Sequence, residues 1–182
     1  MNKAINYCVR VGVIGTLYLV LTYITYPISF GQIQVRIAES LTLLPYIYPE
    51  AVLGVTIGCF LANIFSPFGI IDMVFGTMIT FLAAILTMLL GKHKRPVYMA
   101  PLPPIILNAF GVALYVVPLM GLMGSEGFRI SFLEVIRTIP LNFKVSLYFL
   151  GVLWIGTGEA IATYGLGIPL VIAIERRRKI AI

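Results

Sequence analysis

Uncharged apolar runs, each close to the length of one membrane crossing, recur along this chain and limit what it can fold into. The run from Val11 to Ile24 contains no charged residue, and comparable runs follow as far as residue 174. About 20 apolar residues in an α-helix cross the ~30 Å hydrocarbon core of a bilayer. Charged residues make up only 11% of the chain, whereas a soluble domain has about a quarter. The pattern therefore predicts an integral membrane protein without a large soluble domain.

The spacing of these runs, with prolines and glycines between them, predicts an all-α membrane protein, a compact bundle of six transmembrane helices. We expect a single integral membrane domain over residues 1–182. Its helices are expected at residues 4–26, 34–47, 49–65, 70–90, 97–120 and 145–174. Proline cannot donate the hydrogen bond that continues a helix, so Pro27 is expected to end the first one.

Two segments leave alternatives open. Residues 34–47 are few for a crossing and include Arg36 and Glu39, which predicts a helix that is tilted, partly interfacial or shielded by protein. The outer loop 121–144 mixes charged and apolar residues. That loop is either a short interfacial helix that covers a site or a plain solvated loop.

Two basic clusters indicate the orientation of the bundle. They lie at residues 92–95 and 176–179, and cytoplasmic loops carry the excess of Lys and Arg in membrane proteins. With an even number of crossings, both termini then face the cytoplasm, in a multi-pass protein of the plasma membrane. Because the basic residues stand beside apolar runs, the net charge of +6 does not indicate a nucleic-acid partner.

Motifs for nucleotide binding, catalysis and metal binding are missing from the sequence. Gly91-Lys92 lacks the glycine-rich loop of an ATP-binding motif, and the glycines at 156 and 158 lack the third glycine of a dinucleotide-binding motif. His93 is the single histidine, and the two cysteines form no CxxC pair. We expect no catalytic residue, no cofactor and no metal, with any ATP hydrolysis in partner subunits.

Polar residues at membrane depth are the main functional candidates. A carboxylate there costs about 3 kcal/mol or more unless it is paired or faces a polar cavity, and Glu159 lies near the middle of the last predicted helix. It either contacts a ligand, pairs with a basic group such as Arg36, or is a protonated carboxyl. Asn108 and Tyr115 share one face of the fifth helix, which contacts either a ligand or a neighbouring helix.

Four further residues belong to the candidate binding site. Asn63 and Asp72 flank the outer turn between the third and fourth predicted helices, at the depth of a site open to the outside. Asp72 alternatively stabilises the N-terminus of the fourth helix. Arg36 and Glu39, three residues apart, alternatively pair with each other on one helix face.

Two predicted helices carry a stripe of small residues, which lets another helix approach closely. On the first helix the stripe consists of Ala4, Cys8, Gly12 and Thr16. On the third it consists of Gly54, Gly58 and Ala62. We expect one stripe to pack inside the bundle and the other to be available to a partner protein. The alternative is that both stripes only pack against other helices of the bundle.

The segment from Ile28 to Ala84 contains three motifs that point to a family. They are Arg36-Ile37-Ala38-Glu39, Leu41-Thr42-Leu43-Leu44-Pro45 and Gly58-Cys59-Phe60-Leu61-Ala62-Asn63. On these motifs the chain resembles the substrate-binding S components of energy-coupling factor (ECF) transporters, in the QueT-type queuosine-precursor branch, and the resemblance extends more loosely over the whole chain.

The resemblance implies six helices, cytoplasmic termini, a pocket near the outer face and no nucleotide site. It also implies docking on a transmembrane coupling subunit (EcfT-like) that carries two ECF ATPases, with toppling of the S component to release solute inside. The docking face would be the stripe on the first helix. Cys8 and Thr16 stand there at positions that are often Ala or Gly in the family.

The ligand that the resemblance implies is a deazaguanine precursor of queuosine, such as the aminomethyl form. Glu159 would then accept from the ring N–H and the exocyclic amine, since charge-assisted paired bonds are strong. Asp72 or Glu39 would meet the aminomethyl cation, and Tyr115 or Trp154 would stack on the ring.

Three other functions compete with this one. The chain is alternatively an S component for another vitamin-like solute, or a small ion-coupled carrier or channel that uses Glu159 as a proton relay. An assembly subunit without any ligand is the third. Ligand screening and flux measurements without ATPases distinguish them.

Overall fold

The computed structural model describes residues 3–30, 34–122 and 145–180, and each regular element among them is helical. In chain order the elements are α1 (Lys3–Ile24), α2 (Tyr26–Ser29), η1 (Ile37–Tyr46), α3 (Ala51–Asn63), α4 (Gly69–Ile71), η2 (Asp72–Gly76), α5 (Thr77–Lys92), η3 (Val97–Met99), α6 (Leu102–Leu122), α8 (Val145–Ala162), η4 (Thr163–Gly167) and α9 (Ile168–Ile180). Of these, η1 and η3 are 3₁₀-helices, whereas η2 and η4 are π-helical turns. The all-α prediction is confirmed.

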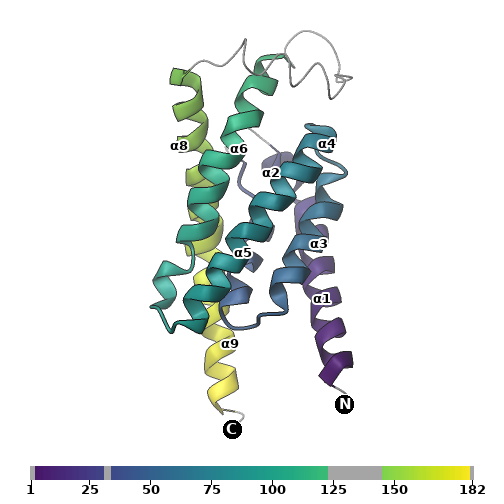
Figure 1. Cartoon of the computed structure of the whole chain (residues 1–182), viewed down its shortest axis with the longest axis vertical. Coiled ribbons are helices and arrows are strands. Elements are labelled where there is room, and N and C mark those ends of the chain that lie inside the picture. Colours follow the sequence, from purple (N-terminus) through teal and green to yellow (C-terminus); the bar gives the residue numbers. More distant parts are fainter. Residues whose placement is uncertain (1–2, 31–33, 123–144, 181–182) are drawn as a thin grey trace.

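The helices form an elongated bundle, in which α8 and α9 follow one another along one line and α5 and α6 run in opposite directions (Figure 1). The N- and C-terminal helices α1 and α9 begin and end at the same end of the bundle, which we call the terminal end. The short helix α4 lies at the opposite end, which we call the far end. The predicted outer loop begins within α6 and otherwise lies outside the described residues.

Four helical stretches are long and apolar enough to cross a membrane, which indicates a multi-pass membrane protein. They are Ala4–Ile24, Gly69–Lys92, Val97–Leu119 and Val145–Arg177. Two further helices of the bundle, α3 with 13 residues and η1 with 10, are shorter than a full crossing in an α-helix, so a count of six crossings is not confirmed. The first helix ends at Ile24, before the predicted position, and Pro27 lies in the first turn of α2, where a missing N–H costs nothing.

The 3₁₀-helix η1 lies in the interior of the bundle and differs from the α-helix predicted at 34–47. Its residues 38 to 45 are all buried, and it packs against α1, α3, α5, α8 and η4. A 3₁₀-helix rises about 2.0 Å per residue against 1.5 Å in an α-helix, so these 10 residues extend about 20 Å. Of the three alternatives for this segment, shielding by protein is the one that the structure shows.

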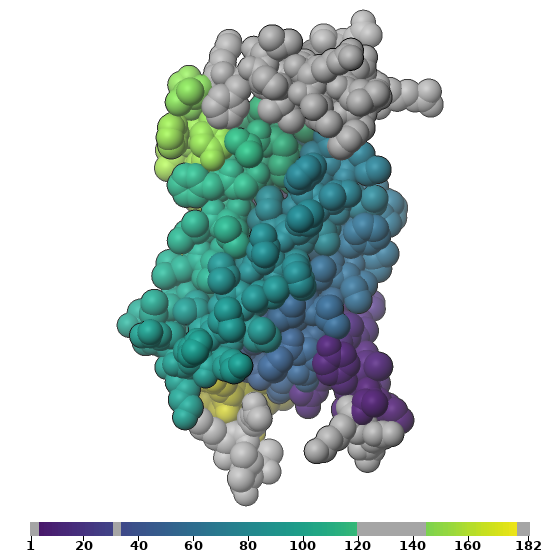
Figure 2. Space-filling view, viewed as in Figure 1, coloured from purple at the N-terminus to yellow at the C-terminus, as the bar shows by residue number. Residues whose placement is uncertain are grey.

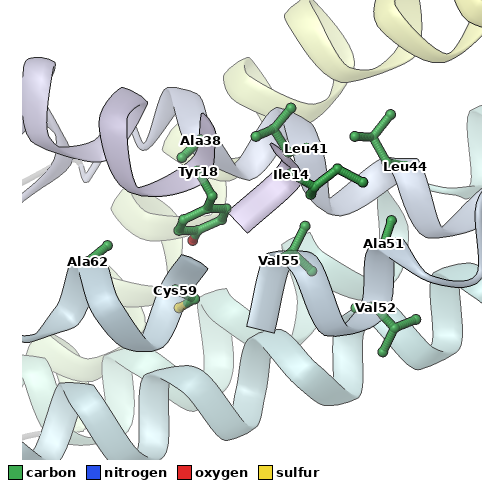
Figure 3. Close-up of a cluster of buried hydrophobic side chains, with 11 residues drawn as sticks. Ile14, Tyr18, Ala38, Leu41, Leu44, Ala51, Val52, Val55, Cys59 and Ala62 are labelled. Carbon is green, nitrogen blue, oxygen red and sulfur yellow. The ribbon is translucent and has the colours of Figure 1, made fainter. Parts of the chain in front are cut away.

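Helices α1 and α3 pack so closely that their backbones touch. A Cβ atom added to Gly58 would lie 2.7 Å from the carbonyl oxygen of Gly15, and one added to Gly54 would lie 2.9 Å from the side chain of Ile14. Next to this contact, Tyr18, Cys59 and Ala62 belong to one buried apolar cluster (Figure 3). The stripe on α3 is therefore used inside the bundle.

Gly58→Leu is expected to lower the stability of the bundle, because the added side chain has to separate α1 from α3. Overpacking of this kind costs about 1–3 kcal/mol. The midpoint of thermal unfolding in detergent measures the loss. Gly12→Leu is the matched control, since a Cβ on Gly12 meets no atom within 4 Å. An equal effect of the two changes would contradict the close contact.

Candidate functional site

Polar side chains from five parts of the chain meet inside the bundle, although the elements around them are apolar. The members predicted from the sequence are all less than a tenth exposed: Arg36, Glu39, Asn63, Asp72, Asn108, Tyr115 and Glu159. They come from η1 with its preceding residue, α3, η2, α6 and α8. They form two neighbouring groups, one around Asp72 and one around Glu39 and Glu159.

Asp72 is the centre of the first group, and other side chains engage both of its carboxylate oxygens. Arg36 Nη2 donates to Oδ2 at 3.0 Å and Ser66 Oγ donates to the same oxygen at 2.6 Å. The hydroxyl of Tyr115 donates to Oδ1. Asn63 Nδ2 donates to the Asp72 carbonyl at 2.9 Å, which binds α3 to η2. Both oxygens of this carboxylate are therefore already bonded to protein donors.

The structure contradicts the predicted pairing of Arg36 with Glu39 and shows no capping hydrogen bond from Asp72. Arg36 does not pair with Glu39; its ion pair is with Asp72, 36 residues further along the chain. The guanidinium also lies over the Phe30 ring, 4.8 Å from the centroid. Asp72 is not a helix cap, because its carboxylate bonds to Arg36, Ser66 and Tyr115 and makes no cap hydrogen bond.

The close approach in this group depends on Gly76, the last residue of the π-helical turn η2. A Cβ atom there would lie 2.7 Å from Asp72 Oδ1, 3.0 Å from Asn63 Nδ2 and 3.1 Å from the Tyr115 hydroxyl. Any other residue would push these groups apart. Single π-helical turns inside α-helices are often found at functional sites.

Glu39 and Glu159 form the second group, in which each carboxylate has only one oxygen engaged by a described side chain. Tyr18 Oη donates to Glu39 Oε1, and Asn108 Nδ2 donates to Glu159 Oε1 at 2.9 Å. The two carboxylates interact electrostatically, and Asn108 interacts with both. Oε2 of each carboxylate is buried and has no hydrogen-bond partner among the described residues.

When ionised, these two carboxylates have no matching positive charge among the described residues. Among the described residues, Arg36 is the one buried cation, and it is already bonded to Asp72. A buried acceptor without a partner costs roughly 1–3 kcal/mol, and more when it is charged. A ligand that brings N–H donors or a cation to the two free oxygens would remove this cost. The arrangement is thus suited to binding a small polar or cationic molecule.

Tyr18 and Ser66 belong to the site but were not among the predicted residues. Tyr18 is fully buried and bonds to Glu39, and Ser66 bonds to Asp72. Tyr18 follows Ile14 and precedes Thr22 at four-residue spacing on the packed face of α1. That helical spacing was the signal available for Tyr18, whereas Ser66 lies in a turn and offered none.

Trp154 does not join either group. Its side chain is 39% exposed on α8, and no described contact connects it to the carboxylates. The stripe on α1 also lies outside the site, since Ala4, Cys8, Gly12 and Thr16 are all exposed. With the α3 stripe packed inside, this face of α1 is available for contact with another protein or with lipid.

Comparisons with known proteins agree on one family. A family model described as QueT transporter matches residues 8–176. A curated relative from Lactococcus lactis subsp. cremoris (strain MG1363), named "Queuosine precursor transporter QueT", is 32% identical over 101 residues, or 54% of this chain and 59% of the relative. The match thus spans less than two thirds of that relative's length. No solved structure matches the chain significantly.

Proposed function

This chain belongs to the QueT transporter family, and from that premise we propose that it is the substrate-binding S component of an ECF-type importer. It captures a queuosine precursor outside the cell and releases it inside after docking on a coupling subunit with two ATPases. Membership in a transporter family favours transport over catalysis as its activity. The observation that carries the binding role is the pair of buried carboxylates with one free oxygen each.

The proposed topology has six crossings with both termini in the cytoplasm. The basic residues support it, because Lys92 ends α5, Lys94 and Arg95 follow it, and a second run begins at Arg176 in the last part of α9. Both runs lie at the terminal end (Figure 1). Cytoplasmic segments carry such an excess of Lys and Arg. The 3₁₀-helix η1 then counts as a crossing that protein shields from lipid.

The carboxylate oxygens without a hydrogen-bond partner, Glu39 Oε2 and Glu159 Oε2, define how a deazaguanine with an aminomethyl group would bind. Glu159 Oε2 accepts from the ring N–H and the exocyclic amine, and Glu39 Oε2 accepts from the aminomethyl ammonium. Of the two acids considered for the cation, Glu39 has the free oxygen, whereas both Asp72 oxygens are already engaged by protein donors. Charge-assisted bonds of this kind are about twice as strong as neutral ones.

Calorimetric titration of the purified chain with aminomethyl-deazaguanine tests the proposal. We expect saturable binding at one molecule per chain, with guanine at least about tenfold weaker because it lacks the cation. Riboflavin is the control for nonspecific uptake and is expected not to bind. If none of the three binds, the assignment of the substrate is wrong. Flux of solute or protons into liposomes without ATPases would instead favour a carrier that uses Glu159.

Gly12→Leu is expected to prevent assembly with the coupling subunit while substrate affinity stays unchanged. The added side chain fills the exposed stripe of α1 but meets no atom of this chain within 4 Å. Co-purification with the coupling subunit and ATPases measures assembly. Gly165→Leu is the matched control, because Gly165 is also exposed and also has open space around it. Assembly of Gly12→Leu at the level of the control would exclude α1 as the docking face.

A further inference from the structure

An apolar groove lies between α5 and α6 at the terminal end of the bundle, away from the polar site. It encloses about 560 Å³. Leu86, Leu89, Leu102 and Ile106 contribute to its apolar wall, and the lining also includes His93 and Arg95. Helices α5 and α6 lie side by side in Figure 1, and their ends at the terminal end are on the visible face in Figure 2. The groove therefore combines a hydrocarbon-like wall with basic groups at one end.

Hydrogen bonds connect the loop that carries the basic groups to α5 and η1. The Arg95 backbone N–H donates to the Leu90 carbonyl at 2.9 Å, and the Tyr46 hydroxyl of η1 donates to the Arg95 carbonyl. Lys94 adopts a left-handed backbone with φ of 52° to make this turn. The Arg95 backbone is thus bonded at both its N–H and its carbonyl, which places this residue beside the groove.

These cations have no acidic partner within the described parts of the chain. Lys92, Lys94 and Arg95 are all exposed. The ion pairs found among the described residues involve Arg10 with Glu50 and Arg36 with Asp72. Three unpaired cations beside an apolar groove at one end of a membrane protein are suited to a molecule with an anionic head and a hydrocarbon tail.

We propose that this groove binds an anionic phospholipid from the leaflet that surrounds the terminal end. One acyl chain lies along Leu86, Leu89 and Ile106, and the phosphate contacts the Arg95 guanidinium. Leu86 is six residues before Lys92, so the wall reaches about 9 Å from the loop toward the middle of the membrane. Basic pockets between transmembrane helices bind anionic head groups in the same way.

A second groove, between other helices, serves as a comparison for the effect of Arg95 on lipid head-group preference. It lies between α6 and α8, encloses about 380 Å³, and is lined by residues such as Phe110, Val152 and Leu153. Its lining contains no charged side chain. It therefore accepts an acyl chain of any lipid and provides no reason for head-group preference, whereas the groove beside Arg95 does.

Native mass spectrometry of the full chain, mixed with equal amounts of phosphatidylglycerol and phosphatidylcholine, tests the proposal. We expect the first bound lipid to be phosphatidylglycerol. Arg95→Gln is expected to reduce its retention about fivefold, the effect of losing one cation near the membrane surface. Arg177→Gln is the matched control, since Arg177 is exposed at the same end but does not line the groove; a change below about twofold is expected.

A second pair of variants tests the acyl part of the groove. Leu86→Trp fills it and is expected to reduce phosphatidylglycerol retention to the level of phosphatidylcholine. Leu82→Trp, at a similarly exposed position one turn earlier, leaves the lining intact. The thermal midpoint of each variant checks that it is folded. Equal effects of Arg95→Gln and Arg177→Gln, no effect of Leu86→Trp, or displacement of the lipid by equimolar glycerol phosphate would each overturn the proposal.

Discussion

Glu159→Gln is expected to lower the affinity for aminomethyl-deazaguanine by at least about 100-fold, the loss typical of removing one partner of a buried charged hydrogen-bond pair. The amide has nearly the shape of the carboxylate and can still accept from Asn108 through its oxygen. At the position of Oε2, however, it presents an N–H₂ donor to the donors of the ligand. The fold is therefore preserved while the ligand's ring loses its acceptor. Calorimetric titration measures the change.

Two further variants test whether the loss of affinity is specific to the Glu159 carboxylate. Glu175→Gln removes a carboxylate from α9 outside the site and is expected to leave the affinity unchanged. Glu39→Gln is expected to weaken the aminomethyl form strongly but guanine little, because Glu39 meets the cation and not the ring. Wild-type affinity of Glu159→Gln for the aminomethyl form would show that this carboxylate does not contact the ligand.

Asp72→Asn is expected to destabilise the protein by about 3–5 kcal/mol, the cost of breaking a buried ion pair from one side. The change leaves the Arg36 guanidinium, whose side chain is only 7% exposed, without its counterion. The asparagine can replace some of the bonds from Ser66 and Tyr115 but not the charge. Chemical unfolding in detergent measures the loss.

The exposed ion pair of Arg10 with Glu50 provides the control for this variant. The Arg10 side chain is 49% exposed, so Glu50→Gln is expected to cost less than about 1 kcal/mol. Adding Arg36→Met to Asp72→Asn removes the unpaired cation and is expected to recover part of the stability. Equal losses for Asp72→Asn and Glu50→Gln would mean that the buried pair contributes nothing beyond a surface pair.

The sequence was a good guide to the helices and to the buried polar residues. The stretch predicted at 70–90 is observed as Gly69–Lys92, because a long apolar run is bounded there by a Pro–Gly turn and a basic loop. Polar residues at membrane depth have to be shielded, so the burial of Asn108, Asp72 and Glu159 followed from their positions alone.

The sequence did not show which buried side chains bond to each other or in which direction a side chain points. Arg36 bonds to Asp72 and not to its neighbour Glu39, since that choice depends on where η2 lies in space relative to Arg36. Trp154 was expected at the ligand, but it lies on the exposed surface. Lipid and protein interior are equally apolar, so hydropathy does not show which way a membrane tryptophan points. The 3₁₀ geometry of η1 likewise left no periodic pattern in ten residues.

The buried 3₁₀-helix η1 also affects how this protein is synthesised. A charged residue opposes the insertion of a lone helix, by about 2.5–3.5 kcal/mol at the helix centre. The 10-residue helix η1 carries Glu39 in its first turn and Arg36 directly before it. Asp72 and Asn108, which interact with these two residues, are made later than η1. We therefore expect the segment to become stable in the bilayer only after η2 and α6 have been synthesised.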